Sequence, residues 1–363
     1  MPILDQGYQH WDGKLAGRGL RWLAITRQGV KAQFKNRWMV STLVGALAPA
    51  LALAGFLVLW GLFEQQATIL EPILFLFRDL PQEIRDGPKA FRATFWTLAF
   101  ALFFQVQTFF AFLLVMLVGP DLISQDLRFN ALPLYLSRPL RRVDYFLGKF
   151  GVIATFLVAI MLAPALLAYL IGLAFSLDPS VLRDTWRVLA ASAAFSAVAA
   201  ASMGLLMLAM SSLSRNSRFV TAMWVALWLL GGAAVDAARQ TPARAWAPLA
   251  SYSDDLASVR EALFDHDAHW AHLSDVFSRG RDAVRGAAGF GGPRRTGLFG
   301  IPIGPPRGAA PPDAPRPPMP PDFEELDDDA PPGWPWSAGV LAGLAAGSVL
   351  VLSTRVRSLD RLK

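Results

Sequence analysis

Three histidines recur at three-residue intervals, at His266, His269 and His272, and Asp265 and Asp267 flank the first of them. Imidazole nitrogens and carboxylate oxygens are common zinc ligands, so this pattern has the chemistry of a metal site. On a helix, however, residues three positions apart are rotated by about 60° from one another, so only neighbouring rings could share an ion. The spacing therefore favours an exposed polar helix, with a metal site as the alternative.

The chain shows no nucleotide-hydrolysing motif. The pair Gly148-Lys149 is followed by Phe150 in place of Ser or Thr, and Val143 stands where a phosphate-binding loop begins with Gly. The chain also contains no cysteine, which excludes a disulfide scaffold, a thiolate-ligated metal site and a cysteine nucleophile. We therefore expect no catalytic residue, no metal and no cofactor in this chain.

The composition indicates a membrane protein. Hydrophobic residues make up 54% of the 363 residues and charged residues 17%, against about 25% in soluble domains. The mean hydropathy is +0.38. A helix needs about 20 apolar residues to cross the bilayer core. We predict an all-α integral membrane protein with six transmembrane helices, at about residues 38–63, 94–119, 150–176, 188–211, 219–235 and 337–353.

The interiors of these spans hold no histidine and no charged residue, and Glu64, Lys149 and Arg187 lie at span ends. A histidine-dependent site at membrane depth is therefore excluded. A carrier driven by protons or sodium is disfavoured, because such carriers usually keep ionisable groups near the midplane. We interpret Gln105 and Gln107, in the second span, as interhelical hydrogen-bond partners rather than substrate ligands.

The basic residues are distributed unevenly across the predicted bundle. With six alternating spans, one side holds both chain ends and two loops, with 18 basic and 6 acidic residues. The other side holds 16 basic and 22 acidic residues. The positive-inside rule therefore places both termini in the cytoplasm. This orientation accounts for the net charge of +6, so we expect the lipid bilayer, and no nucleic acid, as a partner.

The chain divides into five regions by composition. Residues 1–37 form a cytoplasmic tail with a basic amphipathic helix on the membrane surface, and residues 38–235 hold the first five spans. Residues 236–290 form an external amphipathic helical segment. Residues 291–335 form a Pro-rich, acidic, disordered insertion, so the loop between spans five and six is long and partly disordered. Residues 336–363 hold the sixth span and a basic cytoplasmic tail.

Two smaller features concern helix contacts. The N-terminal amphipathic helix either anchors the first span or contacts a cytoplasmic partner, or does both. The candidate residues of this helix are Arg21, Arg27, Lys31, Phe34 and Lys35. The sixth span carries small residues at four-residue spacing, which lets two helix backbones approach closely. These residues, Gly339, Gly343 and Gly347, favour packing within one protomer, with a subunit interface as the alternative.

Residues 120–149, between the second and third spans, have the most specific pattern in the chain. An acidic residue is followed by a leucine-rich stretch, a Ser-x-Pro turn, a second acidic residue and a Gly-Lys pair. The candidate residues are Asp126, Arg128, Ser137, Arg138, Pro139, Arg141, Arg142, Asp144, Gly148 and Lys149. This order resembles the cytoplasmic loop of ABC-2 type transporter permeases, and the six spans and basic N-terminal helix are also similar. Two features depart from that family: Asn130-Ala131, where many members have Gly-Thr, and the insertion at 291–335.

The resemblance implies the membrane-spanning permease subunit of an ATP-driven ABC-2 type exporter, multi-pass in the plasma or inner cell membrane. A separate ABC ATPase subunit would bind residues 120–149 and the N-terminal helix, and that partner would hold ATP and magnesium. Six spans are half of such a transporter, which implies a homodimer or a paired permease. The sequence does not identify a substrate. The alternatives are a non-ABC membrane scaffold or sensor acting through its external loop, and a secondary carrier.

Overall fold

The computed structural model describes residues 21–65, 80–131, 141–176, 178–238, 246–283 and 333–359. These residues are mostly helical and include no strand. Among them, six helical segments are long and apolar enough to cross a membrane. The predicted all-α fold with six spans is therefore confirmed, and the chain is a multi-pass membrane protein.

Each span is longer than the apolar stretch that predicts it, because the helices continue into their polar flanks. The first span consists of α2 (Arg37–Gly45) and α3 (Leu47–Glu64). The second consists of η3 (Pro88–Phe91), α5 (Arg92–Val118) and α6 (Pro120–Arg128), and the third of α8 (Arg142–Ile160) and α9 (Leu162–Ser176). The last three spans lie in α10 (Ser180–Leu213), α11 (Ser217–Ala238) and α14 (Trp334–Leu359).

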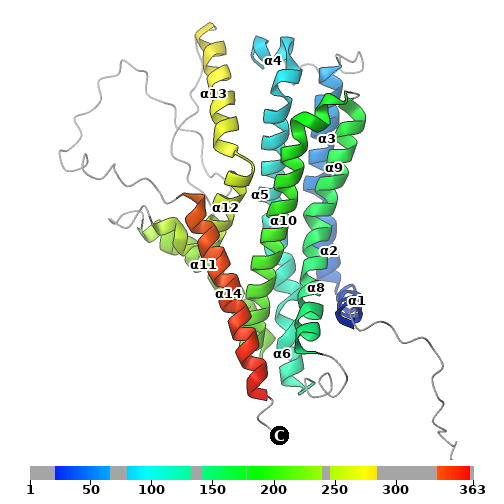
Figure 1. Ribbon diagram of the computed structural model, residues 1–363, viewed down its shortest axis with the longest axis vertical. Helices are drawn as coiled ribbons and strands as arrows, with labels where there is room; N and C mark the ends of the chain where they lie inside the picture. Colours follow the sequence, from blue (N-terminus) through cyan, green and yellow to red (C-terminus); the bar gives the residue numbers. More distant parts are fainter. Residues whose placement is uncertain are drawn as a thin grey trace, which may run out of the picture.

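The bundle has two distinct ends. In Figure 1, α3, α5, α9 and α10 run side by side along the long axis, and α14 crosses the bundle obliquely. α1 (Arg21–Gln33) and α6 lie at the lower end, where the described part of α14 also ends. α4 (Gln82–Asp86) and α13 (His266–Ala283) lie at the opposite end.

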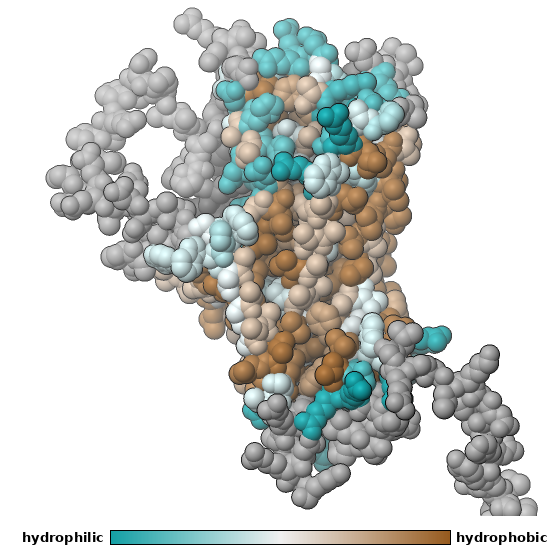
Figure 2. Space-filling view, in the orientation of Figure 1, coloured by the Kyte–Doolittle hydropathy of each residue, from teal (hydrophilic) through white to brown (hydrophobic). Residues whose placement is uncertain are grey.

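A broad apolar belt separates these two ends. Figure 2 shows hydrophobic side chains over the middle of the molecule and hydrophilic ones above and below. Large apolar side chains point outward there, including Leu51, Leu102 and Leu167, which are 72%, 61% and 61% exposed. Side chains of this kind would be unfavourable in water over so large a surface, and lipid tails accommodate them.

Two spans bend at proline. The breaks between α2 and α3 and between α8 and α9 fall at Ala46 and Met161, three residues before Pro49 and Pro164 respectively. Proline has no N–H to donate to the carbonyl four residues earlier, and its ring clashes with that carbonyl. A kink at this position therefore follows from the sequence.

Gln107 occupies the point where these two kinks meet the second span. Its side chain is fully buried, and Nε2 donates to the Ala46 carbonyl at 3.0 Å and to the Ile160 carbonyl. The Ile160 carbonyl is the one that Pro164 leaves without its usual helical donor. The predicted interhelical hydrogen bonds of Gln107 are therefore present, while Gln105 is half-buried.

The chain after α11 folds back against the bundle. η5 (Ala247–Ala250) leads into α12 (Tyr252–Leu263), which packs against α14, α11 and α10 before α13 begins. The Tyr252 hydroxyl lies 2.9 Å from the Ser202 hydroxyl in α10, and both side chains are buried. Residues 291–332 of the predicted insertion lie outside the described residues.

The glycine stripe of α14 faces outward. A Cβ placed at Gly339, Gly343 or Gly347 meets no atom within 4 Å, and all three positions are exposed. Among the described residues, no helix therefore packs closely against these three glycines. α14 instead packs through the opposite face, which includes Leu341 and Leu352. The subunit-interface alternative stays a prediction.

The Gln107→Leu variant tests the role of this amide. The substitution leaves the buried Ile160 carbonyl without a donor, so we expect a loss of about 1–2 kcal/mol in the free energy of unfolding. The matched control, Gln105→Leu, alters a half-buried amide two residues away and should cost less. Denaturant titration in one detergent compares the two variants. Equal losses would show that Gln107 has no special role.

Candidate functional site

The N-terminal helix α1 docks on the start of the third span. Figure 1 shows α1 lying across the direction of the spans beside α8. Thr26 is buried, and its hydroxyl donates to the Gly148 carbonyl at 3.0 Å. A Cβ at Gly148 would lie 2.6 Å from the Cβ of Ile25, and one at Gly151 would overlap the Thr26 hydroxyl. The two helices approach this closely because both positions lack a side chain.

A second set of contacts ties α6 to the same stretch of α8. The Asp126 carboxylate accepts a hydrogen bond from the Tyr145 hydroxyl at 2.7 Å and pairs with the Lys149 ammonium group at 2.7 Å. Lys149 also lies over the Tyr145 ring, 5.5 Å from its centroid. The side chains of Asp126 and Lys149 are 14% and 12% exposed, so this ion pair is shielded from water on most sides.

The position of α6 is fixed from the other side by α10 and α11. The Ser211 hydroxyl in α10 accepts from the backbone N–H groups of Ile123 and Ser124, and it donates to the Pro120 carbonyl. The Ser124 hydroxyl lies 2.8 Å from that of Ser217 in α11. α6 is therefore held by three spans, and a force applied to it would reach all of them.

The start of α8 has a polar cap. The Asp144 carboxylate accepts a hydrogen bond from the Arg141 backbone N–H at 3.1 Å. This contact satisfies one of the N–H groups left without a partner at a helix start, and the negative charge is favourable beside the positive end of the helix dipole. Asp144 thus serves a structural purpose that its sequence position does not reveal.

These contacts place α1, α6 and the start of α8 at one end of the bundle, where they form a single surface. We call it the basic platform. Most of its cationic side chains are exposed, and the short connection between α10 and α11 adds two more. The exposed cations are Arg27, Lys31, Lys35, Arg37, Arg128, Arg141, Arg142, Arg215 and Arg218. Phe129 is 70% exposed beside Arg128, whose guanidinium lies 5.5 Å from the ring centroid.

The remaining predicted residues have less uniform positions. Phe34 contacts Phe156 of α8 edge-to-face, with 5.7 Å between ring centroids, while Arg21 is half-buried. Ser137, Arg138 and Pro139 lie outside the described residues. The structure thus brings the N-terminal helix α1 and the 120–149 segment together. The sequence alone did not predict this contact.

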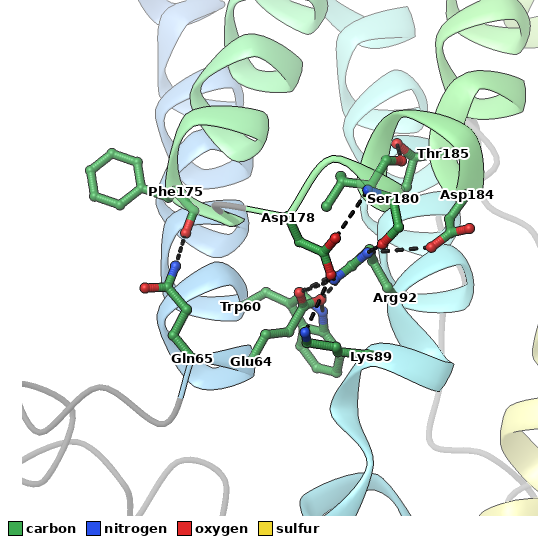
Figure 3. A network of polar contacts seen from close by, with 11 residues as sticks. Trp60, Glu64, Gln65, Lys89, Arg92, Phe175, Asp178, Ser180, Asp184 and Thr185 are labelled. Atoms are coloured by element: carbon green, nitrogen blue, oxygen red, sulfur yellow. Dashed lines mark hydrogen bonds and ion pairs between the residues drawn. The ribbon is translucent and has the colours of Figure 1, made fainter.

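A charged cluster at the opposite end was missed in the sequence. The Arg92 guanidinium, at the start of α5, bonds both Glu64 carboxylate oxygens at 2.6–3.0 Å, and both side chains are 1% exposed (Figure 3). Trp60 Nε1 also donates to Glu64, at 2.7 Å. Glu64 and Arg92 lie 28 residues apart in sequence on different helices, so no local pattern predicts the pair.

The link between α9 and α10 completes this cluster. Arg92 reaches Ser180 at 3.1 Å, Asp184 at 3.3 Å and Asp178 at 3.4 Å, and Lys89 pairs with Asp178 at 3.2 Å. Hydrogen bonds from the Ser180 backbone and hydroxyl, followed by the contact with Lys89, hold the pKa of Asp178 well below its usual range. The cluster thus ties α3, α5 and α10 together.

The three histidines of α13 have separate surroundings. His266 stacks on Trp270, His272 stacks on Phe91, and His269 Nδ1 lies 3.3 Å from the Thr94 hydroxyl. Burial is the main cause that lowers the pKa of His269. Within the described residues, no group of three or more acidic or histidine side chains could hold a metal ion.

Comparison of the chain with protein-family models and with curated protein sequences finds no match.

Replacing Gly148 tests the docking of α1. A leucine there would overlap Ile25 and the Trp22 carbonyl, so Gly148→Leu should release α1 from α8. Limited proteolysis of the membrane-embedded protein should then cleave the α1 region several-fold faster. Gly55→Leu is the matched control, because a Cβ at Gly55 in α3 meets no atom within 4 Å. Unchanged cleavage in Gly148→Leu would contradict the close approach.

Breaking the Glu64–Arg92 pair should destabilise the bundle. Arg92→Met leaves the Glu64 carboxylate buried without its cation, which we expect to cost about 3 kcal/mol of unfolding free energy. The double variant Glu64→Leu/Arg92→Met should recover a large part of that loss. Lys89→Met, at the 63% exposed Lys89, should change stability by less than about 1 kcal/mol. Thermal unfolding in detergent ranks the variants, and a double variant no better than the single would refute the assignment.

Proposed function

We propose that this chain is the membrane-spanning permease subunit of an ATP-driven exporter of the ABC-2 type, and that it resides in the cell membrane. The observation that carries the proposal is the basic platform, in which the N-terminal helix and residues of the 120–149 segment meet at one end of the bundle. Such a surface suits a soluble partner that must move several spans together. In this proposal the platform faces the cytoplasm, because its exposed charges are basic.

The contacts within the platform support a mechanical role. α6 is bonded to α8 through Asp126 and to α10 through Ser211, and α1 packs against α8 at Gly148. A partner that moves α6 and α1 would therefore move spans two, three and four as a group. A separate ATPase subunit would bind and hydrolyse ATP with magnesium, and its closure would supply the movement.

The residue at the end of α6 also fits the resemblance. Asn130 has a φ of 49°, in the left-handed region that glycine adopts most readily and asparagine tolerates. Many ABC-2 permeases have glycine at this place, and glycine and asparagine are the residues that adopt such a φ most readily.

Six spans imply that a second permease copy, identical or related, completes the exporter. Much of the first, fifth and sixth spans is exposed in the single chain, with 22%, 28% and 22% of their most apolar windows buried. These spans therefore have room for lipid and for a second subunit.

The first experiment is a mild-detergent purification of the tagged chain from its native membrane, with co-purifying proteins identified by mass spectrometry. We expect a near-stoichiometric ATPase with a phosphate-binding loop. Charge reversal on the platform, Arg128→Glu with Arg142→Glu, should reduce its recovery at least ten-fold, because both side chains are exposed there. The matched control is Arg183→Glu, an exposed arginine at the opposite end, which should retain the partner.

Two outcomes would contradict the proposal. An intact, abundant chain that recovers no ATPase would favour a scaffold, a sensor or a secondary carrier. Equal loss of the ATPase in the platform and control variants would show that binding does not depend on the basic platform.

A further inference from the structure

One buried carboxyl group has no role in the arrangement described above. Asp255 lies in α12 and is 1% exposed, yet neither of its oxygens has a hydrogen-bond partner of normal geometry in the described chain. Buried carboxylates in proteins are normally paired or hydrogen-bonded, because an isolated negative charge is very costly away from water. A buried carboxyl group without a partner is therefore best accommodated in its neutral, protonated form.

The surroundings of Asp255 form a closed junction between α12 and α14. Ser337, near the start of α14, is 1% exposed, and its hydroxyl lowers the pKa of the Asp255 carboxyl. Trp336, beside it, meets Trp246 edge-to-face at 5.5 Å between ring centroids, just before η5. α12 and α14 pack along each other from this point. Asp255 thus lies between two segments whose separation it can influence.

The titration of Asp255 falls near neutrality. Burial raises the pKa of this carboxyl to about 7, the Ser337 hydroxyl acts against the rise, and the charge of Asp254 adds to it. Asp255 also affects its neighbour Tyr252, because burial and the charge of Asp255 both raise the pKa of the Tyr252 hydroxyl.

No described cation neutralises Asp255. On α12 itself, Arg260 pairs with Glu261 at 3.6 Å. α14 and η5 carry no charged residue near this junction. On the other packed elements, the charged or titratable groups whose side chains are described are Asp236 and Arg218 on α11, Arg183, Asp184 and Arg187 on α10, Arg92 on α5, and His266, Asp267, His269, His272 and Asp275 on α13. None of these groups affects the pKa of the Asp255 carboxyl, and the one charge that does is that of its neighbour Asp254.

We propose that Asp255 is a proton-binding site, and that its occupation determines how tightly α12 packs against the start of α14. The protonated carboxyl is neutral, so it can stay buried at this junction without a cation. Loss of the proton places an unpaired negative charge at the junction, which favours separation of the two helices and entry of water. The ligand is a proton, and no other species is consumed or released.

The sign of the effect follows from the direction of the pKa shift. The folded state holds the Asp255 proton more strongly than the unfolded chain, whose aspartates titrate near 3.8. The contribution to stability is therefore fully present below about pH 4 and declines as the pH rises towards about 7, where the folded carboxyl ionises. Above that pH the contribution is absent. The packing of the junction should loosen over the upper part of the same range.

The test uses the full chain in lipid nanodiscs with one spin label on each helix. The chain contains no cysteine, so Leu263→Cys on α12 and Ala342→Cys on α14, both at exposed positions, give two unique labels. We expect the distance distribution between the labels to lengthen or broaden between about pH 6 and about pH 8, with a midpoint near 7. Asp255→Asn, a neutral isostere, should keep the distribution of low pH at both values.

Two further variants make the result decisive. Asp267→Asn removes an exposed carboxylate on the neighbouring α13 and should behave like the parent chain. Ser337→Ala removes the hydroxyl that lowers the pKa of Asp255, so the midpoint should move to higher pH, even if Asp255→Asn does not fold. A distribution that ignores pH, or a pH response that persists in Asp255→Asn, would overturn the proposal. A response to sodium concentration at constant pH would assign the site to a metal cation instead.

Discussion

The arrangement of the first three spans depends on the hydrogen bonds of the Gln107 side chain. In a bilayer, each backbone carbonyl must find a donor within the protein, because lipid tails offer none. Pro164 removes the donor of the Ile160 carbonyl, and Gln107 replaces it while also bonding the Ala46 carbonyl. One amide therefore joins two kinks and the second span. The same spans carry the basic platform, because α5 leads into α6 and α8 packs against α1.

The glycines of α8 and those of α14 differ in whether another helix packs against them. Gly148 and Gly151 let α1 lie against α8, with the Thr26 hydroxyl bonded to a helix carbonyl. The glycines of α14 have the spacing usually associated with such contacts, and yet they face open space. Small residues thus permit a close contact, but a partner helix of suitable direction is also needed.

The distribution of ionisable groups follows the cost of burying charge. Among the described residues of the basic platform most cations are exposed, and the shielded pair Asp126–Lys149 connects two helices. At the opposite end, Arg92 is surrounded by acceptors from α3, from α10 and from the connection between α9 and α10, which compensates its loss of hydration. Asp255 differs from both groups because it is buried without a compensating cation. Its protonation is the remaining way to avoid the cost of an isolated charge.

The sequence by itself determined the helical class, the six spans and the two proline kinks, because apolar run length and missing N–H groups act locally along the chain. It also marked Gly148, Asp126 and Lys149 as candidates, without showing that α1 covers the first of them. Only the tertiary structure paired Glu64 with Arg92, buried Asp255 and turned the α14 glycines outward. These features depend on which helix faces are in contact, and residues far apart in sequence decide that together.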